Sequence, residues 1–89
     1  MQFEWDAAKA ASNLAKHGVD FAQAMAVFTD PARLTITDVR HTAEHRENTT
    51  GLAQGLLLTI THTDRAGVTR LISARLASRS ERNHSHAPR

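Results

Sequence analysis

The chain has 89 residues, no cysteine and a formal net charge of +2 at pH 7. This length allows one small domain with a single modest core, and the lack of cysteine excludes a disulfide framework and a thiolate metal site. No apolar run is long enough to cross a bilayer, and the acidic N-terminus does not resemble a signal peptide. We therefore expect a cytoplasmic protein that does not enter membranes.

The charge is distributed unevenly along the chain. Residues 1–39 carry three basic and five acidic side chains, whereas residues 40–89 carry eight arginines and four acids. The second half is therefore where a polyanion would bind. Because every base in that half is an arginine, the composition favours phosphate recognition over a merely solubilising surface.

The N-terminal part predicts a short strand at residues 2–5 followed by two helices. Asp6 is a suitable N-cap for an alanine-rich helix over residues 7–16, and Gly18 is a suitable end for it. Asp20 caps the second helix. The apolar residues of this second helix recur at helical spacing and predict a buried face: Phe21, Ala24, Met25 and Phe28.

The remainder predicts four strands. Residues 33–38 alternate as a strand should, and a polar segment leads into a second strand near residues 46–52. Residues 55–63 form the strongest strand pattern, and the turn signal at 64–67 folds it back on residues 68–75 as a hairpin. Strand, two helices and four strands give an α+β domain with an antiparallel sheet and both N-terminal helices packed on one side.

The hairpin register decides which side chains share a face. If the loop has four residues, Thr63 pairs with Val68, although a slip of one residue would reverse every assignment. With that register, six side chains lie on one face of the sheet: Leu56, Leu58, Ile60, His62, Leu71 and Arg75.

A short terminal helix is expected after the last strand. Ser78 and Glu81 have the spacing of a capping box for it. We expect the folded domain to span residues 1–82 and residues 83–89 to be a disordered tail.

Four arginines follow one another between residues 68 and 82, namely Arg70, Arg75, Arg79 and Arg82. The guanidinium fork matches phosphate oxygens in bidentate fashion and keeps its charge at any working pH. The alternative interpretation is a solvated face with ordinary surface ion pairs.

Histidine and arginine together can supply RNA cleavage without a metal ion. The reaction needs a base for the ribose 2′-hydroxyl, cations for the phosphorane and an acid for the leaving 5′-oxygen. The further candidates are Lys16, His17, Arg46 and His62. A lone histidine is more commonly a satisfied surface or core residue, so both interpretations stay open.

Residues 41–45 spell H-x-x-E-H, the pattern with which some zinc peptidases bind metal on one helical face. Here the pattern lies in a polar segment between predicted strands, and the domain is too small for a peptidase cleft. His84-x-His86 is a weaker pattern in the tail. We therefore predict no metal ion and no cofactor.

Residues Phe3 to Pro31 closely resemble the start of the BrnT toxin family, whose pattern runs F-E-W-D-P-x-K-A-x-x-N-x-x-K-H-G-V. Glu44-His45-Arg46 is similar to the family's acidic pair followed by arginine. Arg70-Leu-Ile-Ser-Ala-Arg75 resembles its R-I-I-S-A-R segment, and Glu81-Arg82 its E-R ending. The resemblance covers about residues 2–82.

The resemblance implies a RelE-like fold and a type II toxin: a ribonuclease that inhibits translation and is neutralised by a BrnA antitoxin. The partners implied are a BrnA-like antitoxin, an RNA substrate, and operator DNA only through the antitoxin complex. Arg75 and Arg82 would hold the scissile phosphate with help from Arg46, and His17 would transfer a proton, unless it is only a cation at the helix C-terminus. The candidate RNA contacts are Lys16, Glu44, His62, Arg70, Arg79 and Glu81.

The sequence departs from the family pattern at three positions. Ala7 replaces a usual proline, His62 a frequent tyrosine, and His84 lies about where a tyrosine often ends the last helix. Loss of aromatic residues leaves two alternatives to an active enzyme. One is a degenerate member that acts as a binding or corepressor protein in the complex, and the other is a generic RNA-binding module.

Overall fold

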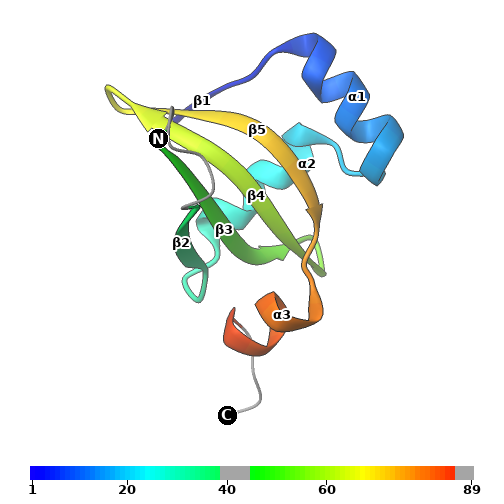
Figure 1. Ribbon diagram of the computed structural model, residues 1–89, viewed down its shortest axis with the longest axis vertical. Coiled ribbons are helices and arrows are strands. Elements are labelled where there is room, and N and C mark those ends of the chain that lie inside the picture. The colour runs from blue at the N-terminus through cyan, green and yellow to red at the C-terminus, as the bar shows by residue number, and fades with distance from the viewer. Residues whose placement is uncertain (39–44, 86–89) are drawn as a thin grey trace.

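The computed structural model describes residues 1–38 and 45–85. Its five strands are β1 Gln2–Glu4, β2 Leu34–Asp38, β3 Arg46–Ala53, β4 Leu56–Arg65 and β5 Val68–Leu76. They form one sheet in the order β1-β5-β4-β3-β2 (Figure 1). All neighbouring strands are antiparallel except β1, which pairs in parallel with β5. The predicted α+β class and element order are confirmed.

The helices are α1 Ala7–His17, α2 Phe21–Ala24, the 3₁₀ helix η1 Met25–Thr29 and α3 Arg79–Ser85. The predicted caps of α1 are confirmed: Asp6 accepts hydrogen bonds from the N–H groups of Ala8 at 2.7 Å and Lys9 at 3.2 Å. Gly18 ends the helix in the left-handed region, with φ of 72°. None of the described helices is long and apolar enough to span a bilayer.

The second predicted helix changes type after Ala24. Because a 3₁₀ helix has three residues per turn, every third residue faces the same side. Phe21, Ala24 and Val27 are accordingly the fully buried positions, whereas Met25 and Phe28 are only partly buried. The predicted buried face is therefore confirmed at Phe21 and Ala24. In η1 the fully buried residue is Val27, in place of the predicted Met25 and Phe28.

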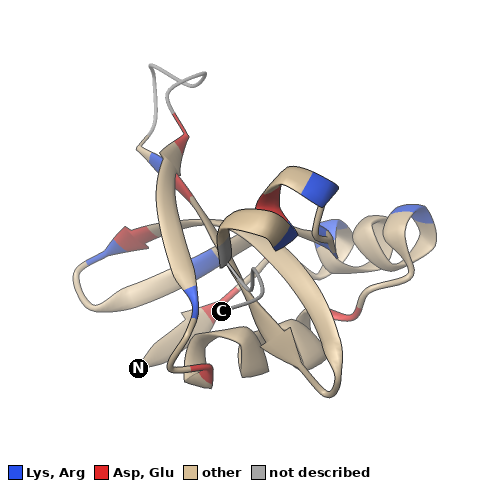
Figure 2. Cartoon of the chain, turned by 90° about the horizontal axis from the view of Figure 1, so that it is seen from below, with Lys and Arg blue, Asp and Glu red and all other residues tan. Residues whose placement is uncertain are grey.

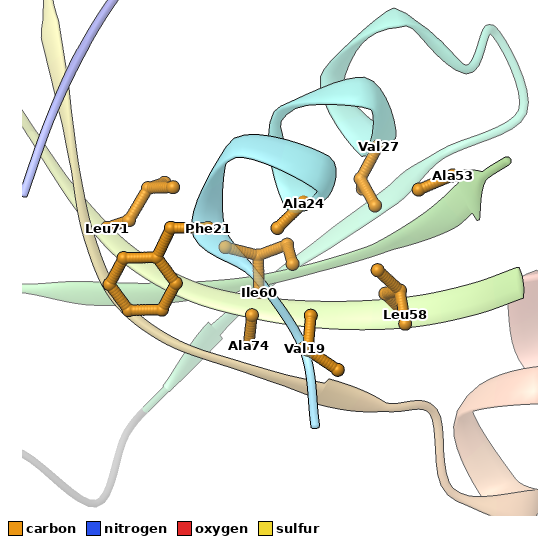
Figure 3. Packing of buried hydrophobic residues seen from close by; sticks show 9 residues of the cluster. All are labelled: Val19, Phe21, Ala24, Val27, Ala53, Leu58, Ile60, Leu71 and Ala74. Carbon is orange, nitrogen blue, oxygen red and sulfur yellow. The ribbon is translucent and has the colours of Figure 1, made fainter. Parts of the chain in front are cut away.

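α1, α2 and η1 cover one face of the sheet, which we call the core face (Figure 1). The buried side chains come from both layers and interlock between the α2–η1 segment and β3, β4 and β5 (Figure 3). The cluster consists of Val19, Phe21, Ala24, Val27, Ala53, Leu58, Ile60, Leu71 and Ala74.

The β3–β4 and β4–β5 hairpins each turn through two residues. Gln54 and Gly55 have φ of 52° and 83°, and Ala66 and Gly67 have φ of 53° and 81°. Positive φ at both central residues is the type I′ geometry, whose twist matches that of the flanking strands. The predicted four-residue loop is wrong, because β4 continues to Arg65.

A β-bulge divides β5 into two halves, and the pairing with β4 shifts by one residue between them. Leu71 pairs with His62 while Ser73 pairs with Thr61, so Ile72 is the extra residue. Leu71 and His62 lie on the core face as predicted. The same prediction is wrong for Arg75, because one extra residue turns every later side chain to the other face.

A buried asparagine joins α1 to the edge of β5 beyond the end of β1. The Asn13 amide accepts a hydrogen bond from the Ala74 N–H at 3.0 Å and donates to the Ala74 carbonyl at 2.8 Å. It also donates to the Val19 carbonyl at 3.0 Å. The side chain thus takes the place of a neighbouring strand there, because buried backbone polar groups need partners.

The terminal helix begins with the predicted capping box. The Ser78 N–H donates to Glu81 Oε1 at 2.8 Å, and the Glu81 N–H donates to Ser78 Oγ at 3.2 Å. α3 continues to Ser85, beyond the expected end of the domain at residue 82. Residues 86–89 lie outside the described residues.

Candidate functional site

The face of the sheet opposite α1, α2 and η1 we call the open face. The bulge brings two arginines of β5 onto it: Arg70 pairs with Thr63 and Arg75 with Thr59, and both threonines point to the same side. Five residues apart in an unbroken strand, the two arginines would face opposite sides. The register assigns to this face Arg46, Asn48, Thr50, Thr59, Thr61, Thr63, Arg70 and Arg75.

Arg75 forms a bidentate ion pair with Glu81 of α3 across one end of the open face. Nη1 donates to Oε1 at 2.7 Å and Nη2 to Oε2 at 2.9 Å. The Arg75 side chain is 35% exposed and that of Glu81 22%. A guanidinium held in this way has a defined position, while the side chain as a whole remains partly exposed.

The Glu81 carboxylate is held from three sides. Besides Arg75, the Ser78 N–H donates to it, and the Thr59 hydroxyl donates to Oε1 at 3.0 Å. The Arg75 hydrogen bonds lower the pKa of Glu81 to about 2, although burial acts in the opposite direction. Glu81 is therefore a fixed anion at neutral pH and has no proton to give.

A row of hydroxyl and amide groups lies on the open face between the two arginine positions of β5. The hydroxyl oxygens of Thr50 and Thr59 are 2.7 Å apart, and the Thr61 hydroxyl donates to the Asn48 side chain at 2.6 Å. Sequence reasoning missed these residues. Their signal was the alternation of polar residues along β3 and β4, which marks a second polar face.

Arg79 and Arg82 lie on α3, on either side of Glu81 in the sequence, and both are exposed. Figure 2 shows basic and acidic positions next to each other on this helix. The structure therefore brings the C-terminal arginines and Arg75 to one end of the sheet, as the sequence suggested.

The other two arginines of the open face lie away from α3. Arg46 is the first residue of β3, and its partner in the register with β2 is Asp38. Arg70 donates to Glu4 of β1 at 2.7 Å, and both side chains are about half exposed. Five of the predicted basic residues thus share the open face or α3, but they span the length of the sheet.

Lys16 and His17 are exposed at the C-terminal end of α1. They border a shallow depression of about 270 Å³ between α1 and the bulge of β5, whose lining includes Ile72 and Ser73. Among the described residues no hydrogen bond or ion pair joins His17 to the Arg75–Glu81 pair. Ser73, which lines this depression together with His17, points to the same face of β5 as Arg75.

His62, expected to contact RNA, lies on the core face and is only 3% exposed. Its Nε2 lies 2.8 Å from the Thr49 hydroxyl and its Nδ1 3.2 Å from Asp64. The ring also meets Phe28 edge-on, with centroids 5.0 Å apart. The imidazole is thus part of the packing and is not accessible to RNA.

Three of the sequence hypotheses cannot be placed in full. Glu44, a candidate RNA contact, lies outside the described residues, as does most of the H-x-x-E-H motif. The His84-x-His86 pattern is described only at His84, whose Nδ1 lies 2.8 Å from the Ser80 carbonyl.

No curated protein matches the chain. The model of the family described as "Ribonuclease toxin, BrnT, of type II toxin-antitoxin system" matches residues 5–81. The matched region includes the whole of β3, β4 and β5 and the Arg75–Glu81 pair. The chain therefore belongs to the BrnT family of ribonuclease toxins of type II toxin–antitoxin systems.

Proposed function

We propose that this chain cleaves RNA without a metal ion, at the end of the open face where α3 meets β5. The observation that carries the proposal is the fixed guanidinium of Arg75 beside the exposed arginines of α3. Preorganised donors aimed at developing charge are generally the largest contribution to catalysis of this kind.

The proposed reaction is attack of the ribose 2′-oxygen on the adjacent phosphorus. A bond forms between that oxygen and phosphorus, and the bond from phosphorus to the 5′-oxygen breaks, which leaves a 2′,3′-cyclic phosphate. Arg75 and Arg82 bind the phosphate oxygens and stabilise the added charge, and Arg46, which lies away from α3 on the same face, assists as a further cation. His17 is the leading candidate for proton transfer, since an imidazole can accept the 2′ proton or supply one to the 5′-oxygen.

In this proposal Glu81 is a positioning residue. It engages Nη1 and Nη2 of Arg75, and a guanidinium has five N–H donors in a fixed fork. The carboxylate therefore sets the orientation of the fork that meets the phosphate. Lys16, Arg70 and Arg79 would contact the RNA backbone as further cations.

The same ion pair also favours a second function. A guanidinium already neutralised by Glu81 attracts phosphate less strongly than a lone one, which fits a member that binds its antitoxin but cleaves RNA poorly. Such a chain would act as a corepressor within the toxin–antitoxin complex.

A toxin of a type II system has a cognate antitoxin partner. We propose that this partner is a BrnA-like protein encoded beside the toxin, that it covers the basic open face, and that operator DNA is bound only through it. An acidic or amphipathic segment would complement the arginines there. Cleavage of cellular RNA would take place in the cytoplasm.

Incubation of the purified chain with RNA in excess EDTA tests the proposal. We expect cleavage that yields 2′,3′-cyclic phosphate ends, and Arg75→Ala should reduce the rate by roughly 10²-fold, the scale seen when one charge-stabilising donor is removed. Arg65→Ala removes the same charge from the tip of the β4–β5 hairpin and should leave the rate unchanged.

Two results would overturn the assignment. Equal rates for wild type and Arg75→Ala would remove this arginine from the reaction. Intact RNA with folded wild-type protein, together with tight antitoxin binding, would instead support the corepressor function.

A further inference from the structure

Three side chains that bind metals in proteins converge on the core face, on the opposite side of the sheet from Arg75. They are Glu47 of β3 and His62 and Asp64 of β4, and one ligand atom from each lies within 4.8 Å of the other two. Glu47 and His62 are direct cross-strand partners, so the sheet register itself sets their approach. The cluster takes no part in the proposed RNA chemistry.

The His62 ring is fixed before any ligand arrives. Nε2 lies 2.8 Å from the Thr49 hydroxyl, which lies 2.8 Å from the Thr35 hydroxyl. The imidazole is 3% exposed, and Phe28 packs against it edge-on. If Nε2–H donates to Thr49, the lone pair of Nδ1 points toward the carboxylates. Metal-binding histidines commonly have this arrangement, in which a second partner fixes the tautomer.

The carboxylates complete a mixed nitrogen and oxygen donor set. Asp64 Oδ1 lies 3.2 Å from His62 Nδ1, a distance at which two lone pairs repel unless a proton or a cation lies between them. The Asp64 side chain is 48% exposed, which leaves an entry path and room for water as a fourth ligand.

We propose that Glu47, His62 and Asp64 form a binding site for one divalent first-row metal ion, with Zn²⁺ as its representative. One imidazole and two carboxylates suit such an ion, whereas Mg²⁺ and Ca²⁺ prefer oxygen ligands alone. Tetrahedral Zn²⁺ requires ligand atoms roughly 3.4 Å apart. The ligand atoms of the three side chains now lie within 4.8 Å of one another. Rotation of the Glu47 and Asp64 side chains toward the fixed imidazole would shorten these distances to the required value.

The site would be structural. The ion ties β3 to β4 at one end of the sheet and stabilises the folded chain by mass action, because the unfolded chain has no such arrangement. RNA cleavage in EDTA is unaffected by this site, so the two proposals succeed or fail separately.

Calorimetric titration of the EDTA-treated, desalted chain with Zn²⁺ tests the proposal. The chain has six histidines in all, and adventitious binding to others is separated by comparison of variants. We expect one saturable site in the wild type and in Glu4→Gln, which removes an exposed carboxylate elsewhere. Asp64→Asn should weaken the binding by at least about tenfold, and Glu47→Gln serves the same purpose should Asp64→Asn fail to fold.

A second measurement examines the imidazole directly. Thr49→Val removes the partner of Nε2 and should weaken Zn²⁺ binding roughly 10- to 100-fold, as for other outer partners of metal ligands. In nitrogen-resolved NMR spectra of the wild type, Zn²⁺ should shift Nδ1 of His62 while Nε2 keeps its proton. Equal Zn²⁺ affinity of wild type and both carboxylate variants, or an Nδ1 that stays protonated at saturating Zn²⁺, would overturn the proposal in favour of a simple hydrogen bond to Asp64.

Discussion

The orientation of Arg75 depends on Glu81, and Glu81 in turn depends on its own helix. The carboxylate accepts the Ser78 N–H as half of the capping box of α3 and binds both terminal nitrogens of Arg75. The capping of α3 and the placement of the Arg75 guanidinium therefore depend on the same carboxylate. A chain that failed to cap α3 would also lose the arrangement of its proposed phosphate-binding group.

The ionised state of Glu81 makes part of the stability depend on pH. Its pKa in the folded chain is about 2, against an ordinary value of 4.5. The stabilisation is therefore fully present above about pH 4.5 and is lost as the pH falls toward 2. Because water screens this partly exposed pair, we expect Glu81→Gln to lower the free energy of unfolding by about 1–2 kcal/mol at pH 7.

Urea unfolding at a series of pH values measures this effect. The difference between wild type and Glu81→Gln should shrink steadily from pH 4.5 downward. Glu4→Gln, which removes the partner of Arg70 in a more exposed pair, is the control and should change stability by less than about 1 kcal/mol. A difference for Glu81→Gln that stays constant with pH would contradict the assigned pKa.

Asn13 is expected to be the most sensitive polar residue of the fold. It is 6% exposed, and its amide bonds the main chain of Ala74 and Val19. Asn13→Ala leaves buried backbone groups without partners, so we expect a loss of about 2–4 kcal/mol in the free energy of unfolding. Ser12→Ala, an exposed neighbour on the same helix, is the control. Similar stabilities of the two variants in urea would show that α1 does not depend on this contact.

Among the secondary-structure elements, β5 does most to define the open face. Its first half follows one register and its second half another, and the bulge at Ile72 lets Arg70 and Arg75 point the same way. The strand also receives α1 at its edge and leads into α3. The one extra residue thus places both arginines on the open face.

The element order and several element boundaries could be predicted because they follow from local chemistry, whereas the ends of β4 and α3 were predicted too early. The caps at Asp6 and Gly18, the capping box of Ser78 and Glu81, and the strand alternation all involve residues close together in the sequence. The bulge, the parallel pairing of β1 and the Asn13–Ala74 contact link residues far apart, in the last case by 61 positions. No local pattern specifies such pairings, so the position of Arg75 was wrong and His62 was expected on an accessible surface.

The packing of η1 against β3 leaves little room for a side chain at Gly51. A Cβ there would lie 3.1 Å from both Val27 Cγ1 and the Val27 carbonyl oxygen, and 3.2 Å from Arg33 Cβ. We expect Gly51→Ala to push η1 from the sheet and to lower the free energy of unfolding by roughly 1–3 kcal/mol. Leu52→Ala, on the exposed side of the same strand, should change it by less than about 0.5 kcal/mol. Thermal or urea unfolding that finds Gly51→Ala as stable as wild type would contradict this packing.

The whole protein separates two chemistries onto the two faces of one sheet. The core face carries the helices (Figure 1), the apolar cluster and the Glu47–His62–Asp64 group. The open face carries arginines and hydroxyl groups. The uneven charge along the sequence becomes a basic surface because the arginine-rich residues form β3, β5 and α3. We propose that an antitoxin neutralises the toxin by covering that one face.

Growth of cells after tightly controlled induction of this chain is the most direct measurement of its activity. We expect arrest with wild type and with Arg65→Ala, and relief of the arrest by Arg75→Ala or by co-expression of the neighbouring antitoxin gene. Each variant must accumulate as folded protein to the same level. Normal growth while folded wild-type protein accumulates, or equal arrest by wild type and Arg75→Ala, would contradict a ribonuclease toxin that acts through Arg75.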